Sequence, residues 1–369
     1  MKILLIARTI SIKEGQGRYA FSLIEELSKK NKLIVLAYEL DGKDNFLNNP
    51  NIEIHQIPDL YTLNSFISPV KYFFQTLKFS FKVDLVHILT DFPYYILFCS
   101  LPWIKNKPFV ISSIGTYGLV SLEKNWRRPF LKLAYRRAKK VICISKFTQK
   151  ELLKREKLNN TEVISCGVDL SHWQIDCPVS KFEEKAILGV GGLKDRKGYH
   201  ISIAAVGEVK KKYPNLKYYI VGDQSEKKYF DRLKNLVKEY QLENNVIFLE
   251  KISDHNLIKL YHQVDLFLLT SINVGHKFEG FGLVHLEASA CGLPTIGTYN
   301  CGAEEAIKEG VSGFLVPQND IKATKEAILK ILENKDLAKK IGEGGYKMAQ
   351  EFSWEKITEK YQLIYSQIC

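Results

Sequence analysis

Short apolar runs alternate with segments of helical pattern along the chain, and this alternation restricts the possible folds more than any other feature. In the first half, runs with the length and composition of buried strands occur at Lys2–Ala7, Lys32–Tyr38, Leu85–Leu89, Phe109–Ser113 and Val141–Ile144. Strands that are separated by helices are typical of parallel sheets. The pattern therefore predicts an α/β protein with a doubly wound sheet in this half.

The same pattern begins again at Ala186, after a polar stretch from Gln174 to Lys185. A chain of 369 residues is long for a single hydrophobic core and suits two domains. We predict two Rossmann-like domains, residues 1–175 and 176–353, whose ligand-binding loops face each other across a cleft. The strands expected in the second domain are Ala186–Val190, Lys217–Val221, Val246–Leu249, Val264–Thr270 and Thr295–Thr298.

The sequence EGFGLVHLEASACGLP, residues 279–294, is the motif that says most about function. Its Gly-Phe-Gly turn opens a short predicted helix, Leu283–Cys291. Such a turn leaves the first backbone N–H groups of the helix available to a phosphate. The carboxylates of Glu279 and Glu287 are suited to accept hydrogen bonds from sugar hydroxyls beside that phosphate. The motif therefore predicts a site for a ribose, a diphosphate and a second sugar.

Two further glycine loops follow predicted strands. VGGLKDRKG, residues 190–198, carries Arg196 and Lys197, whose charges are suited to stabilising a departing diphosphate. EGQGRY, residues 14–19, contains Gly15 and Gly17, which allow the backbone to approach a ligand closely. Taken alone, the first loop is as consistent with a plain basic helix start as with phosphate binding, and the second is as consistent with a plain tight turn as with contact to a diphosphate.

The cysteines and the apolar segments argue against disulfides and membrane spans. None of the seven cysteines forms a Cys-x-x-Cys pair and most lie in apolar stretches, so we expect buried reduced thiols and no zinc ligands. The apolar start of the chain is interrupted by Arg8 and is predicted to be a strand, not a signal peptide. No apolar segment approaches the roughly 20 residues that a membrane span needs. We expect a cytoplasmic protein.

Positive charge is concentrated in the first half of the chain. Residues 1–175 hold 26 Lys+Arg against 15 Asp+Glu, which accounts for +11 of the total net charge of +12. Two segments, residues 71–82 and 126–141, mix these basic residues with aromatic ones at helical spacing. Basic amphipathic helices with aromatic residues can lie on anionic membranes, although ordinary surface helices share the pattern. We predict peripheral membrane contact and no nucleic-acid binding, because no recognition motif accompanies the charge.

Several segments taken together resemble the family 4 glycosyltransferases of the GT-B fold. Residues 279–307 resemble the E-x7-E motif of that family with its flanking helix and strand, and VGGLKDRKG resembles its phosphate-binding loop. AKKVICISKFTQKEL (residues 138–152) and EVISCGVDLSHW (162–173) resemble the end of the first domain's sheet and the approach to the linker. FSWEKITEKYQLIY (352–365) resembles the C-terminal helix, which implies that residues 354–369 pack back onto the first domain.

The resemblance also implies roles for individual residues. Glu287 would bind the ribose and Glu279 the donor sugar, while Arg196 and Lys197 would hold the diphosphate. The donor would be a nucleotide sugar. Its sugar would be transferred with retention of anomeric configuration and without a metal or other cofactor. The remaining donor-binding residues would be Phe281, Gly282, Leu283, Gly191, Gly15 and Gly17.

The sequence departs from the family pattern at two positions. Gly192 stands where the phosphate loop often has arginine, so the charge must come from Arg196, Lys197 or Lys194. Ile114 stands where a histidine often contacts the donor sugar. Ser113, Thr116 and Tyr117 are the alternatives for that contact, and the sequence does not choose among them.

Three histidines lie near the predicted sheets and motifs. His87 lies in an apolar strand and is expected to be a packed core residue more readily than a group that faces the cleft. His276 comes three residues before Glu279 and is a candidate site residue, whereas His285 is expected on a solvated helix face.

These observations together predict a retaining glycosyltransferase. It would move a sugar from a nucleoside diphosphate to a hydroxyl of a glycan or lipid-linked acceptor, in bacterial cell-surface polysaccharide synthesis. A GT-B-fold sugar-nucleotide epimerase and a non-catalytic sugar-nucleotide-binding subunit are the alternative hypotheses. The first would act on the donor without an acceptor, and the second would bind the donor without turnover.

Overall fold

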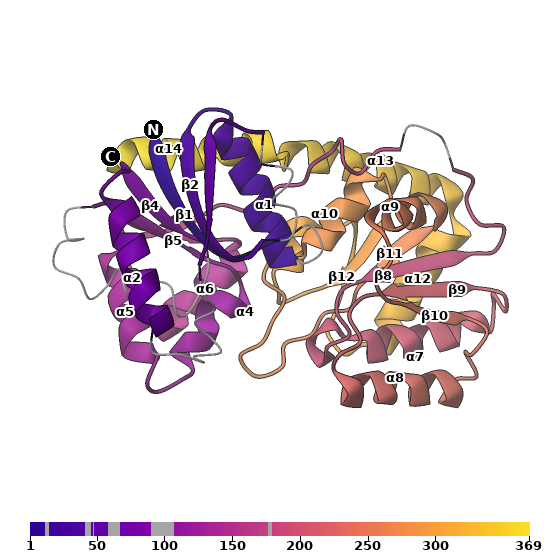
Figure 1. Ribbon diagram of the computed structural model, residues 1–369. Helices are drawn as coiled ribbons and strands as arrows, with labels where there is room; N and C mark the ends of the chain where they lie inside the picture. The colour runs from indigo at the N-terminus through magenta and orange to yellow at the C-terminus, as the bar shows by residue number, and fades with distance from the viewer. Residues whose placement is uncertain (12–14, 41–45, 47, 58–66, 90–106, 176–178) are drawn as a thin grey trace. The chain divides into compact units, whose positions relative to one another are not determined.

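The chain divides into two compact units, each built on its own sheet (Figure 1). The first unit comprises Met1–Gly167 together with Trp354–Cys369, and the second comprises Val168–Ser353. The boundary thus lies between Gly167 and Val168, N-terminal to the boundary predicted at residue 175. The computed structural model describes residues 1–11, 15–40, 46, 48–57, 67–89, 107–175 and 179–369.

The segment that follows Gly167 belongs to the second unit because its side chains pack there. The ring of Trp173 lies 5.1 Å from the ring of Tyr261. His172 Nε2 lies 2.7 Å from a carboxylate oxygen of Asp254. The predicted boundary followed the polar composition of residues 174–185, and composition carries no information about these contacts.

The first unit contains a parallel sheet with the strand order β3-β2-β1-β4-β5-β6-β7. From β1 the chain adds β2 and β3 on one side, and it then adds β4 to β7 on the other side of β1. The strand order therefore reverses between β1 and β4. The strands are β1 (Lys2–Ile10), β2 (Lys32–Leu40), β3 (Ile52–Gln56), β4 (Leu85–Ile88), β5 (Phe109–Ser113), β6 (Lys140–Cys143) and β7 (Thr161–Val163).

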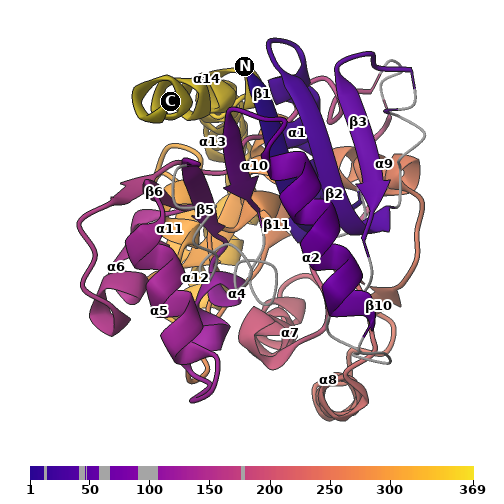
Figure 2. The same ribbon diagram turned by 60° about the vertical axis from the view of Figure 1, so that its left-hand side comes forward.

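Helices flank this sheet, as right-handed crossovers require. The helix α1 packs against α14, which brings the end of the chain back to the first unit, and α2 lies in front of β1 and β2 in the second view (Figure 2). The elements are α1 (Gly15–Ser28), α2 (Ile67–Ser80), α4 (Thr116–Leu119), the 3₁₀ turn η3 (Val120–Leu122), α5 (Arg128–Arg137), α6 (Lys146–Arg155) and α14 (Trp354–Ile368).

The second unit contains another parallel sheet, with the order β10-β9-β8-β11-β12-β13. The order reverses between β8 and β11, and the loops at the carboxyl ends of strands beside such a reversal are where α/β sheets bind ligands. The strands are β8 (Ala186–Val190), β9 (Lys217–Val221), β10 (Val246–Leu249), β11 (Leu266–Leu268), β12 (Thr295–Thr298) and β13 (Gly313–Val316).

The helices of the second unit form a layer on each face of its sheet (Figure 1). On one face α7 packs against α8 and α12, and on the other α10 packs against α13. The elements are η4 (Asp195–Lys197), α7 (Tyr199–Lys210), α8 (Lys227–Glu239), α9 (Asp254–Gln263), α10 (Leu283–Ala290), α11 (Ala303–Ala306), α12 (Ile321–Glu333) and α13 (Lys335–Glu351).

The α/β class and the strands at the centre of both sheets are confirmed. The strand predicted at Val264–Thr270 is shorter, Leu266–Leu268, because the buried residues on either side of β11 continue its apolar pattern without pairing as strand. Two outer strands, β3 and β13, were not predicted. The edge strand β3 is only partly buried along its length, so its sequence IEIHQ lacks a continuous apolar signal.

The burial of the described cysteines differs in part from the prediction. Cys143, Cys166 and Cys301 are buried as expected and Cys291 is partly buried, whereas Cys369 at the end of the chain is exposed. Cys99 and Cys177 lie outside the described residues. Among the described helices, none has the length and apolar character needed to cross a bilayer.

A buried polar network fastens α14 to the first sheet. His87 on β4 hydrogen-bonds to the Tyr365 hydroxyl through Nδ1 (2.6 Å) and to Ser112 Oγ through Nε2 (2.9 Å). The Tyr19 hydroxyl lies 3.0 Å from Ser112 Oγ and 2.6 Å from the Tyr361 hydroxyl. Burial lowers the pKa of His87 to about 3, so the ring is neutral. His87 is therefore a core residue, as predicted.

We expect Tyr365→Phe to lower the free energy of unfolding by about 1–3 kcal/mol, because it leaves His87 Nδ1 buried without its partner. Urea unfolding followed by circular dichroism measures the change. Tyr213→Phe, at a half-buried position beyond the end of α7, is the matched control and should leave the midpoint within error. Equal midpoints for both variants would show that the network does not stabilise the docking of α14.

Candidate active site

The turn before α10 has the conformation that the glycine motif predicts. Gly282 adopts φ +81°, a left-handed conformation that glycine tolerates without strain, and the helix begins at the next residue. The loop comes from β11, so the free N–H groups of α10 lie at the carboxyl end of a strand beside the reversal of strand order. Phe281 and Gly282 are buried, and Leu283 is half-buried.

Glu279, Lys197 and Arg196 meet at this turn. One carboxylate oxygen of Glu279 accepts a hydrogen bond from Lys197 Nζ at 2.6 Å and lies 3.3 Å from Arg196 Nη1. The hydroxyl of Ser271 donates to the same oxygen at 3.1 Å. Lys197 is only 9% exposed and Glu279 only 8%. The structure therefore brings together the three residues that the sequence named as catalytic, in a buried ion pair.

The charges of the cluster stabilise one another. Burial alone would raise the pKa of Glu279, but the charges of Lys197 and Arg196 outweigh it and lower the pKa to about 2. Burial lowers the pKa of Lys197, and the neighbouring carboxylate opposes that change. Because the cluster contains two cations and one anion, it retains one net positive charge. Such a site is suited to an anionic group.

Glycines hold the loop that carries the two cations. Gly198 is left-handed (φ +66°), and a Cβ at this position would lie 1.8 Å from the carbonyl oxygen of Thr270. Gly191 (φ +146°) lies against the Lys197 side chain, 3.2 Å from its Cε at the position of a Cβ. The N–H of Ile272 donates to the carbonyl of Arg196. The loops after β8 and β11 are thus locked together by backbone contacts.

Glu287 lies one turn further along α10. Its side chain is buried and accepts a hydrogen bond from the Tyr261 hydroxyl at 3.2 Å. Tyr261 belongs to α9 and packs on Trp173. The predicted contact of Glu287 with a ribose remains a prediction.

The position predicted for His285 is wrong. The ring is fully buried, its Nδ1 lies 2.6 Å from Thr295 Oγ1, and it packs edge-on against Phe267. Burial lowers the pKa of His285 to about 3. The helix α10 is buried from His285 to Ala290, so it has no solvated face there. His276 is half-buried in the loop before Glu279.

Sequence reasoning missed three residues of the site: Ser271 and Gly302, which donate to Glu279, and Tyr261, which donates to Glu287. The N–H of Gly302 donates to the carbonyl of Glu279 at 2.9 Å, and a Cβ at Gly302 would lie 2.1 Å from the carbonyl oxygen of Gly280. Of these three residues, only Gly302 carries a local sequence signal, because it is a glycine directly before a short helix, α11. Ser271 and Tyr261 lie in segments without a motif.

In the first unit, the predicted site residues lie at the carboxyl ends of β1 and β5. A Cβ at Gly17 would lie 2.9 Å from the backbone of Ser11, so this glycine permits close packing of α1 on the loop before it. Gly15 begins α1 with open space beside it. Ile114 is buried and apolar, so its side chain does not offer the polar contact that a histidine would make at this position. Ser113 is buried with no hydrogen-bond partner for Oγ among the described residues, and Tyr117 is exposed.

Two family models match adjoining parts of the chain. Residues 13–172 match the model of glycosyltransferase family 4, and residues 177–348 match that of the group 1 glycosyl transferases. The chain is a family 4 glycosyltransferase. Its two parallel-sheet units are those of the GT-B fold.

Similar proteins cover the whole length of this glycosyltransferase. An uncharacterized glycosyltransferase of Methanocaldococcus jannaschii is 27% identical over 359 residues, 94% of this chain and 93% of that protein. The chain spans about half the length of several other curated relatives. Among solved structures, Anabaena HepE in complex with UDP-glucose has a TM-score of 0.81 at 21% identity, with 100% of both chains covered.

A second solved structure with the same fold is WaaG, a glycosyltransferase involved in lipopolysaccharide biosynthesis. Its TM-score is 0.72 at 16% identity, with 99% of each chain covered. Within the described residues, no three His, Cys, Asp or Glu side chains are grouped so that they could hold a metal ion. Independence of the glycosyltransferase from metals remains a prediction.

We expect Glu279→Gln to lower the free energy of unfolding at pH 7 by about 3–5 kcal/mol, because it leaves Lys197 buried without its counter-ion. The folded-state pKa of Glu279 is about 2, below its ordinary value of 4.5. The stabilisation is therefore complete above about pH 4.5 and is lost as the pH falls towards 2.

The difference in unfolding free energy between wild type and Glu279→Gln should accordingly shrink between pH 4.5 and pH 2. Chemical unfolding over this range of pH measures it. Glu243→Gln, at an exposed position, is the control and should show no such trend. A difference that stays constant from pH 7 to pH 2 would refute the buried ion pair.

Proposed function

We propose that this glycosyltransferase binds a nucleoside-diphosphate sugar and transfers the sugar, with retention of configuration and without a metal, to a hydroxyl of a glycan or lipid-linked acceptor. The observation that carries the proposal is the buried contact of Glu279 with Lys197 and Arg196 where α10 begins. It combines fixed cations, free N–H groups and a carboxylate at one turn. These groups match the diphosphate and the hydroxyls of such a donor.

In the proposed reaction, the acceptor oxygen forms a bond to the anomeric carbon while the bond to the diphosphate breaks. The hydroxyl proton leaves with the diphosphate. Arg196, Lys197 and the N–H groups before α10 stabilise the negative charge that develops on the leaving group. Glu279 orients the sugar, and its pairing with Lys197 keeps it ionised and fixed before the donor arrives.

The similar proteins support the donor class and the pathway. HepE is described in complexes with UDP and UDP-glucose, and WaaG acts in lipopolysaccharide biosynthesis. We therefore propose a UDP-sugar as the first donor to test and cell-surface polysaccharide synthesis as the pathway. The described activities are transfers, which favours transfer over the epimerase and the silent-subunit hypotheses. A thermal-shift panel of nucleoside diphosphates and their sugars tests the donor class, because a specific ligand raises the apparent stability.

Peripheral contact with an anionic membrane is also part of the proposal. Phe130 and Leu133 lie on α5 and Trp126 lies two residues before its start, and each exposes 38–59% of its surface. Arg128 and Arg137 are exposed beside them. Aromatic and aliphatic side chains with flanking cations suit the interface of an anionic bilayer.

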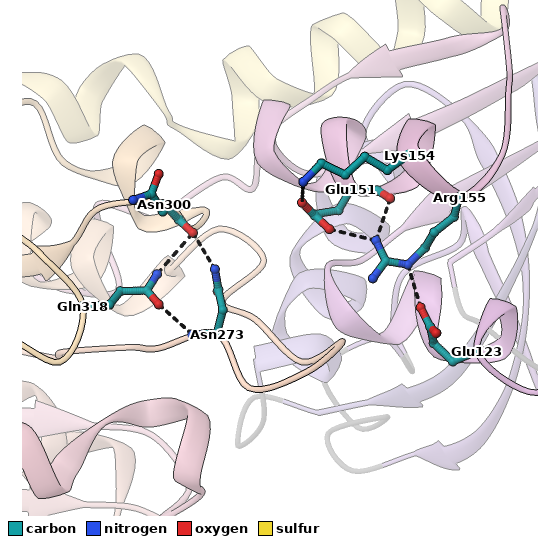
Figure 3. Close-up of polar contacts among 7 residues, drawn as sticks. All are labelled: Glu123, Glu151, Lys154, Arg155, Asn273, Asn300 and Gln318. Carbon is teal, nitrogen blue, oxygen red and sulfur yellow. Dashed lines mark hydrogen bonds and ion pairs between the residues drawn. The ribbon is translucent and has the colours of Figure 1, made fainter.

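The loop that carries Trp126 is braced from α6 (Figure 3). Arg155 Nε donates to Glu123 at 2.6 Å, and its Nη1 donates to the carboxylate of Glu151 at 2.8 Å. Lys154 completes the network through a bond to Glu151. The exposed Trp126 thus lies three residues after Glu123, whose side chain is held by Arg155. We therefore propose a cytoplasmic enzyme that binds the inner face of the cell membrane through these exposed aromatic and basic residues.

We expect Lys197→Ala and Glu287→Ala each to reduce transfer at least about 100-fold, because they remove a charge or carboxylate held at the donor site. Release of the nucleoside diphosphate from the best donor of the panel measures the rate. Lys217→Ala, at the opposite end of the same sheet, is the control and should retain full activity. Near-normal turnover by either site variant, with a native circular dichroism spectrum, would reject its assigned role.

We expect Trp126→Ala combined with Phe130→Ala to reduce recovery with anionic liposomes several-fold, since it removes exposed aromatic area from the surface. Co-sedimentation with vesicles that contain phosphatidylglycerol measures binding. Leu153→Ala on α6, at a similarly exposed position, is the control. Equal recovery of the wild-type protein with neutral and anionic vesicles would count against the electrostatic form of the proposal.

A further inference from the structure

Three amide residues join the loops that follow β11, β12 and β13, and we call them the amide clasp: Asn273, Asn300 and Gln318 (Figure 3). The N–H of Asn273 donates to Gln318 Oε1 at 2.8 Å, and Asn273 Nδ2 donates to the carbonyl of Asn300 at 2.8 Å. Gln318 Nε2 donates to the carbonyls of Tyr299 (2.8 Å) and Asn300 (3.2 Å). One side chain therefore bridges two loops by accepting from one and donating to the other.

One residue of the clasp, Asn273, lies in the same loop as Glu279. The exposed stretch from Asn273 to Lys277 has few apolar contacts of its own, because only Val274 and His276 within it are even half-buried. Its backbone closes on itself through two hydrogen bonds between Val274 and Lys277. The position of this stretch must accordingly depend on polar contacts at its ends.

The partner loop of the clasp touches the active turn directly. The N–H of Gly302 donates to the carbonyl of Glu279, and there is no room for a Cβ at Gly302 beside Gly280. Asn300 is left-handed (φ +59°), and its N–H donates to Glu304 at 2.6 Å. The residue that the clasp holds, Asn300, is therefore only two positions from the residue that donates to Glu279, Gly302.

We propose that Gln318 is a positioning residue for the donor site, an inference that rests on the proposed function. By tying Asn273 to the Tyr299–Asn300 turn, it fixes the two chain segments that flank Glu279: the loop that contains Glu279 and the turn that leads to Gly302. The bridge requires an acceptor and a donor at the tip of one side chain. Glutamine provides both, glutamate provides only acceptors at neutral pH, and leucine provides neither.

The effect on the reaction is expected in kcat more than in donor affinity. The clasp does not itself hold the cations, so binding of the diphosphate is retained when it is broken. The placement of Glu279 against the sugar changes, and small misplacements of reacting groups lower rates steeply. We expect Gln318→Leu to lower kcat about 10-fold to 100-fold while KM for the donor changes less than about 3-fold.

The decisive variant is Gln318→Glu, which conserves size and shape. Its carboxylate would meet the carbonyl oxygens of Tyr299 and Asn300, where the glutamine now donates. We expect a loss at least as large as in Gln318→Leu. Wild-type activity of Gln318→Glu would overturn the proposal, because a role limited to filling space is preserved in that variant.

Hydrogen–deuterium exchange gives a readout that does not depend on turnover. We expect faster exchange at residues 272–282 and at Gly302 in both Gln318 variants, with unchanged exchange in β8 and β9. Asn245→Ala is the matched control, since this amide also donates to two carbonyls, those of Pro214 and Leu216, at the amino end of the sheet. The control should lower thermal stability without changing kcat or the exchange of residues 272–282.

The outcomes separate this inference from the proposed function. If the wild-type chain turns over no nucleoside-diphosphate sugar, the proposed function fails and the catalytic part of the inference fails with it. If the wild type is active with UDP-glucose or another donor and the Gln318 variants match it in kcat and exchange, only the positioning role fails. Slower turnover together with faster exchange confined to residues 272–282 and Gly302 supports the proposal.

Discussion

The buried pairing of Glu279 with Lys197 is the interaction on which the second unit's functional end depends. A carboxylate and an ammonium can both be withdrawn from water only when each satisfies the other. Arg196 and Ser271 add further bonds to the same carboxylate oxygen. The pair also joins the loop after β8 to the loop after β11, across the reversal of strand order. The glycine turns of these two loops and the ion pair between them therefore lie at the same end of the sheet.

That arrangement leaves the cations in place before any substrate arrives. Fixed charges need no reorganisation when a leaving group develops negative charge, and this is the main source of electrostatic catalysis. The two cations share a single anion, so a diphosphate would meet an excess positive charge together with the N–H groups of α10. The carboxylate of Glu279 offsets the repulsion between the two cations.

The sequence could predict this site because each part is local. Glycine turns after apolar runs placed Lys197 and Glu279 at the carboxyl ends of neighbouring strands, and parallel sheets bring such ends together. The burial of His285 could not be read, because α10 is enclosed on every side in its second turn and its polar residues resemble those of a solvated helix. Ser271, Tyr261 and Gln318 act through partners that no periodicity connects to them. The domain boundary failed for the same reason, since the contacts of Trp173 are tertiary.

Two exposed loops, one in each unit, are held in place by different kinds of side chain. In the first unit, Arg155 fixes Glu123 through charges, far along the chain from any predicted diphosphate contact. In the second unit, the neutral amides of Asn273 and Gln318 hold the loop that leads to Glu279 through hydrogen bonds. A glutamate in place of Gln318 would add a negative charge to the potential that the Lys197 cluster presents to an anion. The neutral amide of Gln318 holds this backbone in place without adding a charge of its own.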